Sequence, residues 1–220
     1  MDLEKRLLDI VAGERMTEKD FEQFYKYGDI LALGRAACMV RDRRYPDGVV
    51  TFIIDRNINY TNICQCGCRF CAFYRKKNDP DAYVIDEELL YQKIDEAVEL
   101  GATQLMIQGG LNPGLGLDYF ETMFRNIKQN YNITLHSLTA PEIMFLARKE
   151  GLSVKEVLQR LQEAGLDSLP GGGAEVLHDE VRHYISPRKI KSEEWLDVMR
   201  SAHQIGMKTT ATMMMGSVDQ

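Results

Sequence analysis

Residues 58–73 read INYTNICQCGCRFCAF, and this stretch decides how the rest of the chain is interpreted. It begins with a strand-like segment, Ile58–Thr61, and four cysteines follow almost at once. We therefore expect a strand that ends in a cysteine-rich loop. In folds that alternate strands and helices, functional sites are built at the carboxyl ends of the strands, so chemistry is expected at this loop.

The spacing of the cysteines favours one kind of metal centre. Cys64, Cys68 and Cys71 follow the pattern C-x3-C-x2-C, and three thiolates so spaced can hold three irons of a four-iron, four-sulfide cluster. The fourth iron would then be open to a ligand with an amine and a carboxylate. Cys66 leaves an alternative, because four thiolates on one loop also suit a zinc ion or a closed cluster. Cys38 stands alone and is expected to be a buried, small apolar residue.

Strands and helices alternate after the cysteine loop. We expect helices within 86–100, 117–129, 141–164 and 175–205, and strands at 103–108, 133–138, 166–169 and 208–214. Gly101, Asn132, Gly165 and Gly206 mark the turns from each helix into the next strand. Such repetition predicts an α/β fold with a parallel sheet covered by helices.

The first 48 residues have a different character. Apolar residues at helical spacing, a variant capping box at Thr17–Asp20 and an Ala- and Leu-rich stretch at 29–40 predict a helical segment. A further strand is expected at Val49–Ile54. We therefore expect an N-terminal helical segment at 1–48 and a barrel domain at 49–220 with about five βα units. Since a closed barrel has about eight such units, we expect a partial barrel, truncated at the C-terminus.

Composition excludes several classes of protein. Of 220 residues, 45% are hydrophobic and 27% charged, and 33 acidic against 27 basic side chains give a net charge of −6. The apolar content supports a packed core, and mild acidity without a long basic run argues against nucleic acid or an anionic membrane as main partner. No apolar run approaches the roughly 20 residues of a membrane span. The N-terminus carries mixed charges, so we expect a cytoplasmic protein.

The cysteine motif, with Phe70 before its last cysteine, resembles the cluster motif of radical S-adenosylmethionine (SAM) enzymes. The similarity covers nearly the whole chain and extends to a subgroup that holds dehypoxanthine futalosine cyclases, aminofutalosine synthases and deazaflavin cofactor synthases. It rests on the flanks of the motif and on the segments 108–113, 169–175, 185–189 and 209–214. Within the subgroup, the Ile-Ser-Pro-x-Lys segment and the paired threonines resemble the cyclases more than aminofutalosine synthase.

This resemblance implies a radical SAM (β/α) barrel that holds a [4Fe-4S] cluster through Cys64, Cys68 and Cys71 and binds SAM at the open iron. In the family, one electron from the cluster cleaves SAM, and a 5′-deoxyadenosyl radical takes a hydrogen atom from the substrate. The implied reaction is the cyclisation of dehypoxanthine futalosine in menaquinone biosynthesis. The implied partners are this small molecule and an electron donor such as flavodoxin or ferredoxin, with no nucleic acid and no membrane.

Five residues are expected to contact SAM, namely Tyr74, Gln108, Gly109, Gly110 and Glu175. Glycines at 109–110 let the backbone approach a ligand, although a tight turn would need them equally. Glu175 follows three glycines and is expected to bind SAM or to act as a base, the alternative being a plain glutamate at a helix N-terminus. Tyr74 is expected beside the adenine or, alternatively, in the core.

His136 is the second expected catalytic residue, because strand alternation points it into the barrel; the alternative is a packed polar residue. The basic side chains of the segment Ser186–Lys189 are expected to bind a substrate carboxylate or, alternatively, to lie in a solvated loop. Met213–Met215 is expected in the core of a strand.

Two rival functions stay open at this point. A sister enzyme of the subgroup would share the cluster and SAM, so that only turnover separates the reactions. A non-catalytic iron–sulfur or zinc protein, or an inactive fragment, would bind metal through all four clustered cysteines and would not cleave SAM.

Overall fold

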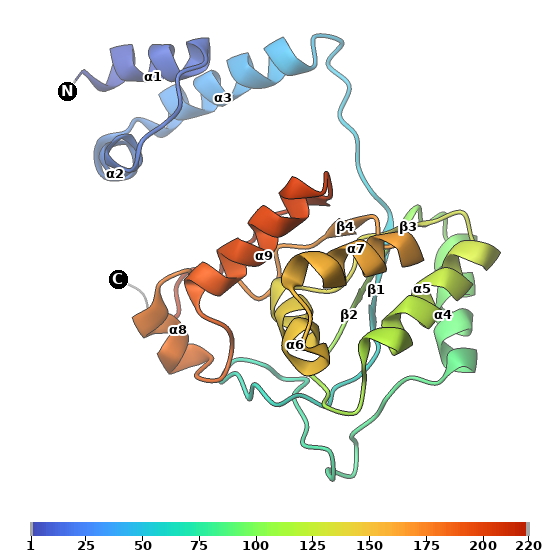
Figure 1. The fold of residues 1–220 in the computed structure, drawn as a ribbon. Helices are drawn as coiled ribbons and strands as arrows, with labels where there is room; N and C mark the ends of the chain where they lie inside the picture. The colour runs from blue at the N-terminus through green and yellow to red at the C-terminus, as the bar shows by residue number, and fades with distance from the viewer. Residues whose placement is uncertain (1, 219–220) are drawn as a thin grey trace. The chain divides into compact units, whose positions relative to one another are not determined.

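The computed structural model describes residues 2–218. The chain divides into two compact units, residues 1–52 and 53–220, which are described separately. Figure 1 traces both units along the chain. None of the helices in the described part of the chain has the length and apolar character that a membrane crossing requires.

The first unit contains three helices: α1 (Leu3–Ala12), α2 (Glu18–Tyr27) and α3 (Ile30–Arg44). Each begins at a side-chain cap, and the expected capping box between Thr17 and Asp20 is present at the start of α2. Arg6 of α1 donates to the buried Asp20 carboxylate at 2.8 Å, which ties α1 to α2. The expectation for Cys38 is wrong: it is exposed, because α3 buries only Ala36 among its residues.

The strand expected at Val49–Ile54 does not form. These residues are extended but outside any strand, and Val50 and Phe52 are 79% and 81% exposed. The first strand, β1 (Asp55–Asn59), starts where its partner β2 (Gln104–Gln108) starts, with Asp55 opposite Gln104. The residues before Gln104 form the turn after a helix, so the ladder does not continue past one bond from the Thr103 N–H to the Ile54 carbonyl, at 3.0 Å.

The second unit is a mixed α/β fold whose described strands are parallel. Besides β1 and β2 it contains β3 (Thr134–Leu135), β4 (Ser168–Leu169) and β5 (Lys208–Thr209). The ladders are β1-β2-β3 and β4-β5, and a single parallel bridge between His136 and Ser168 links them. Strands β3, β4 and β5 are shorter than expected, with two residues each. Met213–Met215 lies beyond β5, and Met213 and Met215 are 74% and 76% exposed, so the expectation of a strand core there is wrong.

Helices alternate with these strands as the sequence predicts. They are α4 (Glu87–Glu99), α5 (Leu117–Asn130), α6 (Ala140–Glu150), α7 (Val154–Ala164), α8 (Asp179–Ile185) and α9 (Ser192–Gln204). Ile58, Ile107 and Leu135 are buried in one core with apolar side chains of α4, α5, α6, α7 and α9. The alternate strand residues, such as Asn59 and Gln108, face away from that core and are half-buried. The strands therefore present a polar face, at whose carboxyl end the loops gather.

Candidate active site

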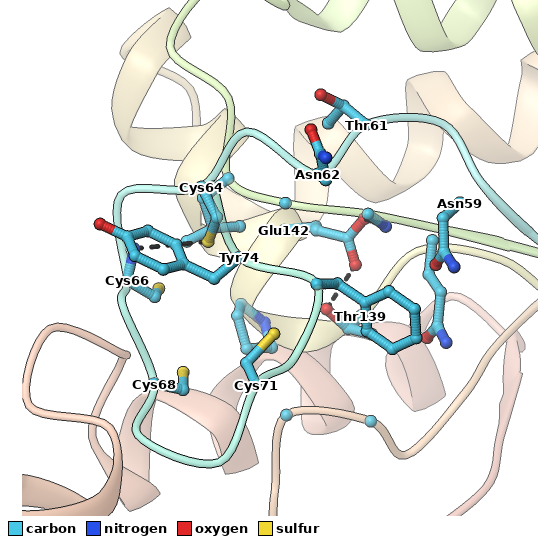
Figure 2. A pocket seen from close by; sticks show the side chains of 18 of the residues that line it. Asn59, Thr61, Asn62, Cys64, Cys66, Cys68, Cys71, Tyr74, Thr139 and Glu142 are labelled. Atoms are coloured by element: carbon cyan, nitrogen blue, oxygen red, sulfur yellow. Dashed lines mark hydrogen bonds between the residues drawn. The ribbon is translucent and has the colours of Figure 1, made fainter. Parts of the chain in front are cut away.

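A cavity of about 320 Å³ lies at the carboxyl ends of β1 to β4. Its walls come from the loops that follow these strands, so residues far apart in the sequence share one space. They include Asn59, Cys64, Gly109, Thr139 and Glu175. Figure 2 shows the cysteine loop on one side of the cavity and Thr139 with Glu142 on another. This edge is where parallel α/β folds bind ligands.

The cysteine loop is anchored by its backbone to its neighbours. The Cys64 N–H donates to the Arg75 carbonyl at 3.1 Å, and the Gln65 N–H donates to the Leu111 carbonyl at 3.2 Å. Further along, the Arg188 side chain donates to the Cys66 carbonyl at 3.1 Å. The loop is thus held between the segment after β2 and the segment after α8. All four thiols of the loop are free and line the cavity.

The thiols of Cys64 and Cys68 are poised to ionise. Interaction with the Cys66 thiol lowers the pKa of each of them, against the opposing effect of burial. The charge of Lys189 lowers the pKa of Cys68 further. The same interactions raise the pKa of Cys66, so its thiol stays protonated, and it donates to the Arg188 carbonyl at 3.8 Å. Thiolates are the form that binds metal, so the loop presents metal ligands at neutral pH.

The arrangement of these ligands fits a cluster better than a single ion. Between residues 2 and 218, no three His, Cys, Asp or Glu side chains converge closely enough to hold one metal ion. A structural zinc site would need such convergence. An iron–sulfur cluster offers a separate iron to each thiolate, so Cys64, Cys68 and Cys71 need only surround a common space, as they do here.

Gly109 and Gly110 are required by packing as well as by the cavity. A Cβ on Gly109 would lie 2.8 Å from the Tyr60 ring and 3.0 Å from the Thr61 carbonyl, and a Cβ on Gly110 would overlap the Ile63 carbonyl. The segment after β2 therefore lies against the segment after β1 at backbone distance. Both residues also line the cavity, so this packing requirement is compatible with the expected approach of the backbone to a ligand.

Glu175 follows the glycine run and forms a buried ion pair. Its carboxylate is 2.9 Å from the Lys189 ammonium, and each side chain is about 12% exposed or less. Glu175 has a left-handed backbone, with φ of 44°. Its second oxygen, Oε2, is buried and accepts no hydrogen bond from residues 2–218, although Arg182 lies 3.8 Å away. A buried, unsatisfied carboxylate oxygen at a cavity is suited to a ligand hydroxyl or amine.

Arg182 holds the glycine run in place. This buried guanidinium donates to the carbonyls of Gly173, Ala174 and Ile190, and the indole N–H of Trp195 donates to the Gly172 carbonyl at 3.1 Å. A Cβ on Gly173 would overlap Pro141 of α6. The wall that carries Glu175 is therefore rigidly attached to α6, α8 and α9.

Glu142 is a buried acid of the cavity that the sequence analysis did not single out. It lies in the first turn of α6, is 2% exposed, and accepts hydrogen bonds from Tyr60 (2.7 Å), Gly109 (3.1 Å) and Thr139 (2.5 Å). Burial raises its pKa to about 7, although these three donors oppose the shift. The spacing of Thr139 and Glu142 is that of a capping box, but the Thr139 side chain caps no backbone N–H and donates to Glu142 instead.

Comparison with known proteins decides the family. Residues 58–219 match the model of the Radical SAM superfamily, which is most of the chain. The chain belongs to the radical SAM superfamily.

Its relatives carry two different names. It is 42% identical over 98% of its length to "Cyclic dehypoxanthine futalosine synthase" of Halalkalibacterium halodurans and equally to that of Streptomyces coelicolor, covering 59% and 55% of those proteins. It is also 41% identical, over 98% of its length and 59% of the relative, to "5-amino-6-(D-ribitylamino)uracil--L-tyrosine 4-hydroxyphenyl transferase" of Methanothermobacter thermautotrophicus. The chain thus spans somewhat more than half the length of these relatives.

Two solved structures share the fold at low identity. Methylornithine synthase (PylB) aligns with a TM-score of 0.66 over 94% of this chain and 57% of its own. The hydrogenase maturase HydG aligns with a TM-score of 0.69 over 96% of this chain and 46% of its own. Both are 16% identical to this chain, so the likeness supports the fold and not the reaction.

In this radical SAM chain, most of the expected site residues meet at one cavity. Besides Cys64, Cys68 and Cys71, it is lined by all five residues that were expected to contact SAM. His136 does not line it: the ring Nδ1 lies 2.7 Å from the Ser168 hydroxyl, and burial lowers its pKa. Of the basic segment 186–189, Lys189 reaches the cavity, whereas Arg188 braces the cysteine loop.

Proposed function

We propose that Cys64, Cys68 and Cys71 hold a [4Fe-4S] cluster and that SAM occupies the adjoining part of the cavity. The observation that carries the proposal is the convergence of these three thiols, Gly109–Gly110 and Glu175 on one space. Family membership supports it further. When bound, the cluster and SAM supply an organic radical that abstracts a hydrogen atom from a substrate C–H bond.

On this proposal, each wall of the cavity has its own task. Gly109 and Gly110 present backbone groups to the methionyl part of SAM without side-chain bulk. Glu175 offers its unsatisfied oxygen to a hydroxyl or amine, while Lys189 binds the other carboxylate oxygen and orients the group. Tyr74 lines the same cavity and is proposed to flank the adenine.

We propose the cyclisation of dehypoxanthine futalosine, as a step of menaquinone biosynthesis, for the reaction; two relatives are named as synthases of the cyclic product. The substrate would give one hydrogen atom to the deoxyadenosyl radical, and then one proton to a base and one electron back to the cluster, so the product would be lighter by two hydrogens. The proposed acceptors of that proton are Glu175, which lines the cavity, and His136, which does not. Burial lowers the pKa of His136 and so favours its neutral imidazole, which is the form that can accept a proton as a base.

The second candidate is the transferase named by other relatives, whose names specify L-tyrosine and 5-amino-6-(D-ribitylamino)uracil. Identities of 41–43% to these proteins match those to the synthases, so similarity alone favours neither. Both candidates use the same cysteines and SAM, and they differ in the substrate that the cavity receives.

Three further parts of the proposal concern the surroundings of the site. The five described strands would form one part of a (β/α) barrel wall. The proposed cluster must receive single electrons from a donor protein, and we propose a flavodoxin or ferredoxin for this role. The cluster ligands must stay reduced, which supports a cytoplasmic location.

One experiment separates these candidates. The protein is reconstituted anaerobically with iron and sulfide and given SAM and a strong reductant, either alone, with dehypoxanthine futalosine, or with L-tyrosine and 5-amino-6-(D-ribitylamino)uracil. The cyclase predicts 5′-deoxyadenosine and a product two hydrogens lighter than the substrate in the second arm only. Product in the third arm only would establish the transferase. A cluster-loaded protein that cleaves no SAM in any arm would contradict both reactions and support a non-catalytic iron–sulfur protein.

A further inference from the structure

Glu142 joins three loops of the cavity through one carboxylate. Its Oε1 accepts the Tyr60 hydroxyl, which follows β1, and the Gly109 N–H, which follows β2. Its Oε2 accepts the Thr139 hydroxyl, which follows β3. Glu142 itself lies in the first turn of α6 and lines the cavity. No other carboxylate within residues 2–218 bonds to all three of these loops.

The same network leaves one backbone acceptor free. The carbonyls of Gln108, Gly110 and Leu111 accept from the Tyr60 N–H, the Tyr60 hydroxyl and the Gln65 N–H, respectively. The Gly109 carbonyl accepts no hydrogen bond from the described part of the chain. The peptide that carries it is held from the other end, because the Gly110 N–H donates to the Thr61 carbonyl at 3.0 Å. In a trans peptide the two groups point in opposite directions, so this carbonyl is directed away from Thr61.

Glu142 controls the orientation of this segment from the preceding peptide. Its bond to the Gly109 N–H and the bond from the Tyr60 N–H to the Gln108 carbonyl hold that peptide at both ends. Because residues 109 and 110 are both glycine, they have no side chain of their own to restrict their backbone angles. Hydrogen bonds must therefore supply the order that side chains cannot.

We propose that Glu142 is the positioning residue that keeps the Gly109 carbonyl directed at the amine of the bound cofactor. This inference rests on the proposed binding of SAM and adds to it a residue that acts through Gly109 and Tyr60. Removal of the carboxylate releases the Gly109 N–H, so the peptide before Gly109 is held at one end only and the direction of the carbonyl is less restricted. Glutamine keeps an oxygen for Gly109 and Tyr60, and its amide can donate to the Thr139 hydroxyl, which then acts as acceptor.

The test is the binding of two ligands that differ in the amine. Equilibrium dialysis of the cluster-loaded protein, without reductant or substrate, measures the affinity for SAM and for 5′-methylthioadenosine, which lacks the amine and carboxylate. Glu142→Ala is expected to weaken SAM binding about tenfold and to leave 5′-methylthioadenosine binding and iron content unchanged. Glu142→Gln is expected to restore most of the affinity for SAM.

Glu121→Ala is the matched control. Glu121 is a similarly buried carboxylate on α5, but it is bound by Arg125 and Arg160 outside the cavity. The Glu121→Ala variant is expected to bind SAM and 5′-methylthioadenosine with the affinities of the wild type. If Glu142→Ala does not fold, Tyr60→Phe, which removes one donor and keeps the ring, is expected to weaken SAM binding selectively in the same way.

Each contrary result has a distinct meaning. Equal affinity of Glu142→Ala and the wild type for SAM would overturn the inference. An equal loss of affinity for both ligands would also overturn it, because that is the effect of a general loss of structure. Failure of the wild type to bind SAM at all would instead overturn the proposed function.

Discussion

The Lys189 ammonium lies 2.9 Å from the Glu175 carboxylate, and the two side chains form a buried ion pair in the wall of the cavity. Lys189 is brought there by the segment between α8 and α9, and Glu175 by the end of the glycine run. Burial lowers the pKa of Lys189, but the charges of Glu175 and Cys68 outweigh it, and the net pKa is raised. The pair thus places a fixed cation beside the cysteine loop.

The first prediction concerns the energy of this pair. Glu175→Ala and Lys189→Ala are each expected to lower the free energy of unfolding by about 3 kcal/mol, because each leaves a buried charge without its partner. The double variant should lose less than the sum of the single losses, since no unpaired charge remains. Urea denaturation of the wild type, the two single variants and the double variant measures these free energies of unfolding. Additive losses would mean that the two side chains are not coupled.

The second prediction separates the roles of neighbouring cysteines. Cys66→Ala is expected to retain iron and sulfide after anaerobic reconstitution, because the Cys66 thiol stays protonated and donates to the Arg188 carbonyl. Cys68→Ala is expected to lose them, because only two thiolates of the motif remain. Iron and sulfide analysis with the visible absorption spectrum checks both. Loss of the cluster in Cys66→Ala would support a site of four thiolates.

The third prediction tests the close approach of the segments after β1 and β2. Gly110→Ala is expected to lower the free energy of unfolding by about 2 kcal/mol, because the added methyl group would overlap the Ile63 carbonyl. Gly114→Ala is the control: its Cβ would approach only the Asn112 side chain, at 3.2 Å, which can move. Chemical denaturation should therefore show little change for the control. A similar loss in both variants would argue against the packing explanation.

The fourth prediction uses the single tryptophan as a reporter of the glycine run. Arg182→Met removes the donors to the carbonyls of Gly173, Ala174 and Ile190 and is expected to cost about 3 kcal/mol. Trp195 is 5% exposed and donates to Gly172, so loosening of this wall should shift its fluorescence to longer wavelength below the unfolding transition. Arg148→Met, at an exposed ion pair on α6, should leave the emission unchanged.

The fifth prediction is a pH dependence that comes from Glu142. Its pKa is raised from 4.5 to about 7 in the folded protein, so folding favours the protonated carboxyl. The stability that follows is fully present below pH 4.5 and is lost as the pH rises through 7. Tyr60, the titratable side chain bonded to it, stays protonated in this window because burial raises its pKa well above 10.

Glu142→Gln should remove this dependence. Between pH 5 and pH 8 the wild type is expected to lose about 3 kcal/mol more stability than the variant. Urea denaturation of the cluster-free proteins at both pH values provides the comparison. Parallel pH profiles would show that Glu142 does not titrate there. Glu121→Gln should not flatten the profile, because Arg160 lowers the pKa of Glu121.

The alternation of helices and strands after Tyr60 was predictable, because apolar periodicity and glycine turns are local signals. The absence of a strand at 49–54 was not predictable from the sequence, because strand formation needs a partner with free backbone groups. The partner strand begins at Gln104, and this decides where the ladder begins. Cys38 was misjudged for a similar reason: helical periodicity does not say how much of a small helical unit is buried.

The sequence by itself determined the cysteine motif, the α/β order and the glycine segments, because each depends on residues close together in the chain. Only the tertiary structure decided which polar side chains share the cavity. Glu142 follows Tyr60 by 82 positions, and Lys189 follows the cysteine loop by more than a hundred, so no local pattern connects them. Their partners are set by strand order and loop packing, which bring the carboxyl ends of parallel strands to one edge.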